Sequence, residues 1–159
     1  MKQLFSIQRR LDERILQEHQ LEREMIFSDK LLALQVEVGE LANETRCFKY
    51  WSKKPSAERS IILEEYVDGL HFILSLGIDK GWEEVPEEIE DADSSLTAQF
   101  QTVYQYAADL AKCSEKQTYI RLFRAYLELG GLLGFSRQEI EEAYLLKNKT
   151  NHKRQTEGY

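Results

Sequence analysis

The apolar residues of this chain recur every three or four positions, the spacing that places them on one face of a helix. The pattern predicts six helices and no strand. The first three are expected over about residues 3–19, 29–52 and 57–79, the fourth ends near 112, and the last two begin after Ser114 and Ser136. Because the chain has no repeat and no low-complexity segment, the predicted fold class is an all-α helical bundle.

Serines suited to cap helix N-termini stand where four of these helices are expected to begin. They are Ser28, one of Ser94 and Ser95, Ser114 and Ser136. The last two precede Gln117 and Glu139 by three positions, which is the spacing of a capping box. Breaks between helices are expected at Pro55 with Ser56, at Gly77 and Gly81, and in the segment GGLLG, 130–134.

The composition is that of one globular domain spanning residues 1–159, with 42% hydrophobic and 31% charged residues. The net charge of −7 disfavours direct binding to nucleic acid or anionic lipid. No apolar run approaches the roughly 18 residues that a membrane span needs, and nothing at the N-terminus resembles a secretory signal. Two cysteines occur, in no metal-ligand spacing, so a cytoplasmic protein is predicted.

Three glutamates of the second predicted helix lie beside its apolar face. Glu37, Glu40 and Glu44 fall within an arc of roughly 60° if each residue advances by about 100°. The apolar stripe that borders this arc comprises Leu34, Val38, Leu41 and Phe48. These glutamates therefore border the predicted core, where like charges repel.

The third predicted helix carries acids on its apolar face itself. Glu65 and Asp68 share an arc with Ile61, Phe72 and Leu76. Burying ionised carboxylates without partners costs several kcal/mol each. Neither helix supplies a Lys or Arg on that face, so something cationic must compensate from elsewhere.

The short break between these two helices predicts an antiparallel hairpin. The pair Glu37 and Glu40 would then face the pair Glu65 and Asp68, with 24 residues between the pairs. Four carboxylates suit Mg²⁺, or alternatively Mn²⁺, and the lack of thiolate or imidazole disfavours zinc. One Glu-x-x-Glu pair is usually a solvated face, but two pairs at hairpin spacing against the core favour a metal site. Other acids are expected on the surface or around the ligands: Glu44, Glu64 and Glu83.

A di-iron carboxylate bundle is the rival metal interpretation. Such sites take a Glu-x-x-His pair from each of two helices. Asp68 and His71 offer a comparable spacing only once, so this interpretation is less favoured than magnesium. His71 is otherwise interpreted as a helix-face residue or a neighbour of the metal ligands.

Three stretches resemble a known family. They are ALQVEVGELANETRCFKYW (33–51), ILEEYVDGLHFILSLG (62–77) and YLLKNKTNHKRQTEGY (144–159). Together they are similar to the dimeric, all-α dUTP pyrophosphatases of bacteria and their phages, within the MazG-like nucleotide pyrophosphohydrolase superfamily. The resemblance covers the first 80 and the last 16 residues, whereas residues 82–140 show no comparable motif.

The resemblance implies hydrolysis of dUTP, and often of dUDP, to dUMP, which keeps uracil out of DNA. It implies that Glu37, Glu40, Glu65 and Asp68 are catalytic and hold two or more Mg²⁺ ions that deliver a water to phosphorus. Glu37 is the preferred candidate for accepting the proton of that water. The family also implies a homodimer, with a site that can borrow residues from the partner.

The family's substrate-binding residues are expected at both ends of the chain. The segment 147–159 is interpreted as a nucleotide-binding tail, with Lys147, Asn151, Arg154 and Tyr159 as contacts. Its cations could instead complement a helix dipole. Gln8 and Asp12 are expected to meet the uracil edge, although relatives would carry an amide near position 12. Trp51 and His71 are candidates for packing on the base or sugar, whereas Phe48 and Phe72 are assigned to the core.

Two alternatives remain at this point. One is a MazG-type pyrophosphohydrolase of broader specificity, which need not carry the 147–159 tail or Gln8. The other is a non-catalytic helical interaction protein whose acids keep it in solution. The number of metal ions and the phosphorus attacked are not fixed by the sequence.

Overall fold

The computed structural model describes residues 1–86 and 94–158, in which there are six α-helices, a short 3₁₀ helix and no strand. The α-helices are α1 (Lys2–His19), α2 (Phe27–Thr45), α3 (Arg59–Lys80), α4 (Leu96–Lys112), α5 (Lys116–Leu132) and α6 (Arg137–Thr156), and η1 spans Arg23–Ile26. The all-α bundle predicted from the apolar spacing is therefore confirmed. No described helix combines the length and the apolar character that crossing a membrane requires.

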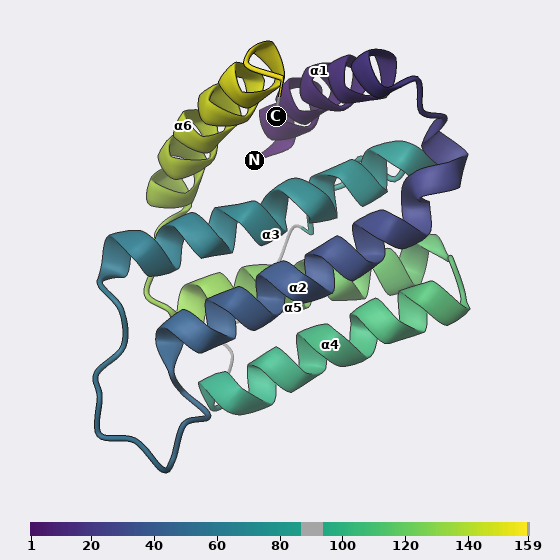
Figure 1. The fold of residues 1–159 in the computed structure, drawn as a ribbon. Coiled ribbons are helices and arrows are strands. Elements are labelled where there is room, and N and C mark those ends of the chain that lie inside the picture. Colours follow the sequence, from purple (N-terminus) through teal and green to yellow (C-terminus); the bar gives the residue numbers. More distant parts are fainter. Residues whose placement is uncertain (87–93, 159) are drawn as a thin grey trace.

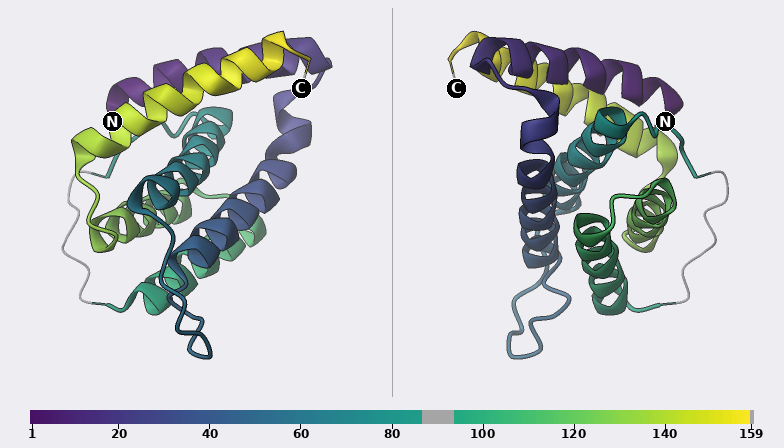
Figure 2. Two further views of the ribbon diagram at one scale, coloured as in Figure 1. Left: turned by 60° about the vertical axis from the view of Figure 1, so that its left-hand side comes forward. Right: turned by 90° about the vertical axis from the view of Figure 1, so that its right-hand side faces the viewer.

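The helices form three layers (Figure 1). The middle layer is the antiparallel pair α2 and α3, and the antiparallel pair α4 and α5 packs on one side of it. On the other side α1 and α6 run in the same direction, side by side (Figure 2). Contacts at both ends fix this register, because the N-terminal amine binds Glu141 and Arg14 donates to the carbonyl of His152 at 2.8 Å.

The central helix α3 is surrounded by the other elements over its second half. The apolar side chains of Leu70, Ile73, Leu74 and Leu76 are completely buried. They point in several directions around the helix, since α3 packs against α1, α2, α5 and α6. A helix enclosed in this way holds its polar side chains in fixed positions relative to four neighbours.

Tyrosine hydroxyls hold α3 close to α5. The Tyr66 hydroxyl donates to the Tyr126 carbonyl at 3.1 Å, and the Tyr126 hydroxyl donates to the Tyr66 carbonyl at 2.7 Å. The two rings stack with centroids 4.7 Å apart. A Cβ at Gly69 or Gly130 would lie only 2.2 or 2.5 Å from the opposing hydroxyl, so this approach requires glycine at both positions.

The second helix ends earlier than the sequence pattern predicts. It stops at Thr45, not at 52, because Arg46 adopts a left-handed conformation (φ 58°) and its N–H bonds the Ala42 carbonyl. The Arg46 side chain then bonds the following loop, at the Ser52 hydroxyl (2.6 Å) and the Lys54 carbonyl (3.1 Å). Phe48 consequently lies in this loop and is 40% exposed, so its assignment to the core is wrong.

Two of the predicted serine caps are present. Ser95 accepts from the N–H of Ala98 at the start of α4. Ser136 and Glu139 form a complete capping box at the start of α6. Gly81 ends α3 in the left-handed conformation, with φ 70°.

The other cap predictions are wrong. Ser28 lies inside the first turn of α2, whose N-cap is Ile26, because η1 leads directly into that helix. The N-cap of α5 is Glu115, one residue after Ser114, without a side-chain cap bond. The break predicted at 130–134 begins only after Leu132, because α5 continues through Gly130 and Gly131.

Candidate functional site

Three carboxylates from two helices meet in the middle layer of the bundle. Antiparallel packing places Glu37 of α2 beside Glu65 and Asp68 of α3, with ligand oxygens all within 4.8 Å of one another. All three side chains are half-buried. We call these three residues the acidic cluster. The hairpin thus brings together three of the four carboxylates that the sequence singled out.

The fourth carboxylate, Glu40, is exposed and lies outside this group of oxygens. It follows Glu37 by almost one turn of α2. Burial is the main cause of the raised pKa values of Glu37 and Glu65, and the charge of Glu40 contributes to both. Glu40 therefore acts on the acidic cluster electrostatically from its solvent side.

The acidic cluster holds more negative charge than its surroundings compensate. Burial raises the pKa of Glu37 to about 7, and the charges of Asp68, Glu40 and Glu65 add to this shift. Burial is also the largest cause of the raised pKa values of Glu65 and Asp68. A cation bound among these groups would relieve their repulsion.

The side chain of Lys147 on α6 contacts the acidic cluster. Its Nζ lies 2.6 Å from Asp68 Oδ2 and 2.8 Å from Glu64 Oε1. Burial alone would lower the Lys147 pKa, but the hydrogen bonds to Asp68 and Glu64 raise it overall. This ammonium supplies part of the compensation that neither α2 nor α3 provides.

The donor set of the acidic cluster fits a hard divalent cation. Mg²⁺ and Mn²⁺ prefer carboxylate oxygens. Within the described part of the chain, no histidine or cysteine belongs to the group of ligand atoms. A di-iron site of the Glu-x-x-His type lacks its imidazoles here.

A cavity of about 490 Å³ adjoins the acidic cluster. It lies between α1, α2, α3 and the C-terminal part of α6, and both Glu37 and Asp68 line it. The other lining residues are Gln8, Leu11, Asp12, Ile15, Leu16, Leu21, Ile26, Asp29, Lys30, Ala33, His71, Phe72, Ser75, Asn151 and Arg154. A mainly apolar cavity of this size with a few polar groups suits a small organic ligand.

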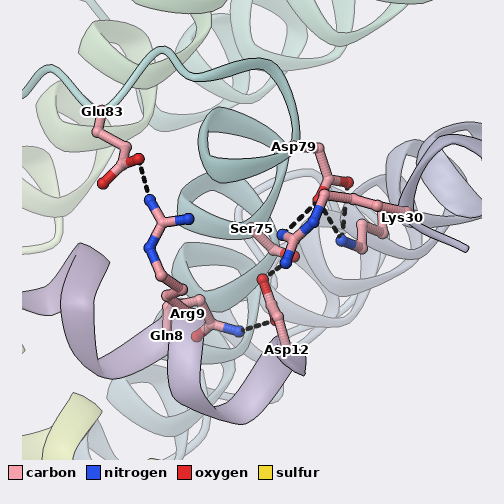
Figure 3. A network of polar contacts seen from close by, with 8 residues as sticks. Gln8, Arg9, Asp12, Lys30, Ser75, Asp79 and Glu83 are labelled. Carbon is pink, nitrogen blue, oxygen red and sulfur yellow. Dashed lines mark hydrogen bonds and ion pairs between the residues drawn. The ribbon is translucent and has the colours of Figure 1, made fainter. Parts of the chain in front are cut away.

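A buried hydrogen-bond network forms part of the wall of this cavity. Gln8 Nε2 and Ser75 Oγ donate to the two oxygens of Asp12, each at 2.7 Å (Figure 3). Gln8 Oε1 accepts from the Tyr144 hydroxyl and lies 2.6 Å from His71 Nδ1. The His71 and Tyr144 rings stack, with centroids 4.1 Å apart. We call these five residues the buried network.

Burial keeps His71 neutral, and Gln8 decides which of its ring nitrogens carries the proton. Burial lowers the pKa of His71 to about 3, with the charge of Lys147 as a second cause, so the imidazole is neutral. Since the amide oxygen of Gln8 can only accept, His71 donates from Nδ1 and its Nε2 carries no proton. Nε2 is buried without a hydrogen-bond partner among residues 1–86 and 94–158. The network therefore ends in one unpaired acceptor.

Asp79 of α3 centres a group of ion pairs at the edge of the cavity (Figure 3). Lys30 Nζ lies 2.8 and 2.7 Å from its two oxygens, and Arg23 Nη1 lies 3.1 Å from one of them. The Asp79 side chain is only 3% exposed. Because Arg23 belongs to η1 and Lys30 to α2, these ion pairs fix the connector after α1 to α3.

Sequence reasoning missed Lys30, Ser75, Asp79 and Tyr144. Each finds its partner at least 49 residues away in the chain, so no local motif marks the pair. One signal was available on α3, where Asp68, His71, Ser75 and Asp79 recur at a spacing of three or four. Such a polar stripe along an otherwise apolar helix indicates a shared face.

The predicted nucleotide-binding tail is the last part of α6, which is helical through Thr156. Asn151 and Arg154 line the cavity, and Lys147 lies one turn earlier on the same side of the helix. Asn148 is buried, and its Nδ2 has no hydrogen-bond partner in the described part of the chain. Tyr159 lies outside the described residues.

Trp51, a predicted contact of the base or sugar, and Phe72, assigned to the core, lie in different surroundings. Trp51 is 64% exposed in the loop after α2, where it contacts Phe48 and Tyr50 edge to face and does not line the cavity. Phe72, assigned to the core, is half-buried and does line the cavity.

Comparison with protein families agrees with this arrangement. A family model described as dUTPase matches residues 1–159, the whole chain. The chain belongs to the dUTPase family. A comparison with curated proteins gave no match.

Family membership confirms the prediction made from the three sequence stretches. The protein is an enzyme, a dUTP diphosphatase, and dUTPases of this family generally depend on a divalent metal. The acidic cluster is a group of three carboxylates in the described structure whose oxygens lie close enough together to hold a metal ion.

Proposed function

We propose that this dUTPase hydrolyses dUTP to dUMP and pyrophosphate with Mg²⁺ at the acidic cluster, and that dUDP is a further substrate, giving phosphate. The observation that carries the proposal is the meeting of Glu37, Glu65 and Asp68 beside a 490 Å³ cavity that Glu37 and Asp68 line. Removal of dUTP in this way keeps uracil out of DNA. The cytoplasm is its expected location, which suits the two free cysteines.

Glu37, Glu65 and Asp68 would hold the metal, and Glu40, whose charge acts on Glu37 and Glu65, would become a fourth ligand by turning its side chain inward. Bound Mg²⁺ supplies Lewis acidity toward phosphate oxygens and lowers the pKa of a bound water. Glu37 would accept the proton when that water attacks phosphorus, because its carboxylate lines the cavity beside the other two acids. In this step the water oxygen would bond to phosphorus, Glu37 would take the proton, and the bridging P–O bond between the α- and β-phosphates would break to release pyrophosphate.

Residues of α6 would bind the phosphates. Arg154 and Asn151 line the cavity, and Lys147 already lies at the acidic cluster, so these groups can meet a phosphate chain that ends at the metal. Tyr159 is expected to act with them. A protein of net charge −7 can bind a polyanion in this way because the metal inverts the local charge.

The part of the cavity near α1 suits the base. His71 lines the cavity, and its buried, unpaired Nε2 would match the N3–H donor of uracil and oppose the N3 acceptor of cytosine once a bound base displaces the side chains that cover it. Gln8 and Asp12 orient this histidine, and Phe72 and Ile15 offer apolar contacts to a ring. A contact from Trp51 would have to reach the cavity of a second subunit, which fits the proposed homodimer.

A broader MazG-type pyrophosphohydrolase is the competing function, and substrate comparison separates the two. We expect purified protein with Mg²⁺ to convert dUTP to dUMP, to act far more slowly on dCTP and dTTP, and to lose activity in EDTA. Ion-exchange chromatography of the products gives the rates. Equal rates on all three nucleotides would establish the broader activity instead.

A further inference from the structure

We infer that Lys147 competes with the divalent cation for Asp68, so that metal binding releases its ammonium toward the phosphates of the nucleotide. The inference rests on the proposed function, since it takes the acidic cluster as the metal site. It gives Lys147 two successive partners, a carboxylate and then a phosphate.

The competition follows from the contacts of Asp68. Its Oδ2 lies 2.6 Å from Lys147 Nζ, and Asp68 also belongs to the group of carboxylates within 4.8 Å that would surround a metal. Mg²⁺ sits about 2.1 Å from its ligand oxygens. A metal on Oδ2 of Asp68 and the ammonium 2.6 Å from that same oxygen would thus be two cations in close contact, and one must withdraw.

Lys147 is the partner able to withdraw. The metal ligands project from α2 and α3, which are packed between other helices, whereas Lys147 is a long side chain that reaches the cluster from α6. Its other contact, Glu64, is 60% exposed and holds the ammonium weakly. The side chain can therefore move while the helices stay in place.

The released ammonium would remain beside the cavity. Asn151 and Arg154 follow Lys147 by four and seven positions on α6, which places all three on one side of the helix, and both line the cavity. A nucleotide bound there presents phosphate oxygens to that side. Metal binding and nucleotide binding then favour each other, because the metal frees the group that the phosphates use.

The test measures Mn²⁺ affinity by electron paramagnetic resonance in nucleotide-free protein after treatment with EDTA. Lys147→Met removes the competing cation and is expected to bind Mn²⁺ about tenfold more tightly than wild type, after allowance for solvent screening. Lys147→Arg keeps the charge and is expected to stay close to wild type. Lys149→Met, an equal charge change at an exposed neighbour on another side of α6, should alter the affinity less than about twofold.

A second measurement follows Lys147 in the unaltered protein. Acetylation of its ε-amine by an N-hydroxysuccinimide ester, read by mass spectrometry, should become faster when Mn²⁺ is added, while acetylation of Lys149 stays constant. This readout does not depend on how any variant folds.

The two possible failures are distinguishable. If wild-type protein binds no Mn²⁺ and Glu65→Gln behaves identically, the metal site of the proposed function is wrong. If wild type binds Mn²⁺ but Lys147→Met binds equally or more weakly, or Lys147 acetylation is unchanged by the metal, the competition is refuted and the metal site stands.

Discussion

The acidic cluster and the buried network contribute to the walls of the same cavity, yet their carboxylates are compensated in opposite ways. Both oxygens of Asp12 accept hydrogen bonds from neutral protein donors, at 2.7 Å each. Asp79, nearby, is paired with Lys30 and Arg23. The acidic cluster instead brings three carboxylates within 4.8 Å of one another. Of these three, Asp68 is the one that forms an ion pair with Lys147.

This difference separates the groups that hold the fold from those that await a ligand. Removing a buried carboxylate whose acceptors are filled by the protein strands its donors and so lowers the stability of the native state. Carboxylates that repel one another destabilise the metal-free protein, and a bound cation would relieve this repulsion. Substitutions in the acidic cluster should therefore mainly change activity, whereas substitutions of the carboxylates that the protein itself pairs should mainly change stability.

The largest effect is expected for Glu65→Gln, and it falls on activity. Removing one metal ligand should lower kcat/KM for dUTP on the order of a thousandfold. The melting temperature in EDTA should rise, because the charge of Glu65 no longer repels Glu40 and Asp68. Steady-state kinetics and differential scanning calorimetry measure the two effects.

The matched control is Glu13→Gln, on the exposed side of α1, which should change neither quantity. Nearly full activity in Glu65→Gln would remove the acidic cluster from the reaction.

The next effect falls on stability. Asp79→Ala leaves the buried Lys30 ammonium without its two short contacts and should lower the free energy of unfolding by about 3 kcal/mol. Glu84→Ala is the contrasting variant, because its ion pair with Lys116 is exposed on both sides and should contribute less than about 0.5 kcal/mol. Urea denaturation measures both losses of stability. Similar losses in the two variants would show that the buried ion pair contributes no more than the exposed one.

The smallest effect is a pH dependence of stability from Glu37. Its pKa is raised from 4.5 to about 7 in the native state, so between these values the folded protein retains a proton that the unfolded chain releases. The free energy of unfolding should therefore fall as pH rises through this window. Because Glu37 is only half-buried, screening limits the change to about 1–2 kcal/mol. Glu37→Gln should remove it, as urea denaturation in EDTA at several pH values would show.

His71 changes stability in the other direction, since its pKa is lowered and the native state loses stability as pH falls below 6.5. Wild type and Glu37→Gln both carry His71, so its effect cancels in their difference. Saturating Mg²⁺ should also abolish the Glu37 effect by holding the carboxylate ionised. A constant difference between the two proteins at all pH values would show that Glu37 does not titrate in this range.

Local signals predicted most of the fold. Apolar spacing located the helices, and Ser95, Ser136 and Gly81 marked real ends because each acts within its own turn. The errors lie where tertiary contacts decide. The second helix stops at Thr45 because Arg46 bonds a loop that periodicity does not describe.

The part of the site that depends on local sequence was predictable, and the part that depends on helix packing was not. The acids of α2 and α3 stand on a hairpin, whose geometry follows from a short connection. Lys30 with Asp79 and Gln8 with Tyr144 join segments 49 and 136 residues apart, and such pairs depend on how whole helices pack. The resemblance to a family found Lys147 but did not anticipate its contact with Asp68.

The paired hydroxyl-to-carbonyl bonds between Tyr66 and Tyr126 also set a requirement for protein engineering. They begin at the residue next to Glu65 and end on a helix that carries no acid of the cluster. Transplanting the two acid-bearing helices into another scaffold would leave this anchor behind. A working graft needs α5 as well, with glycine retained opposite each ring.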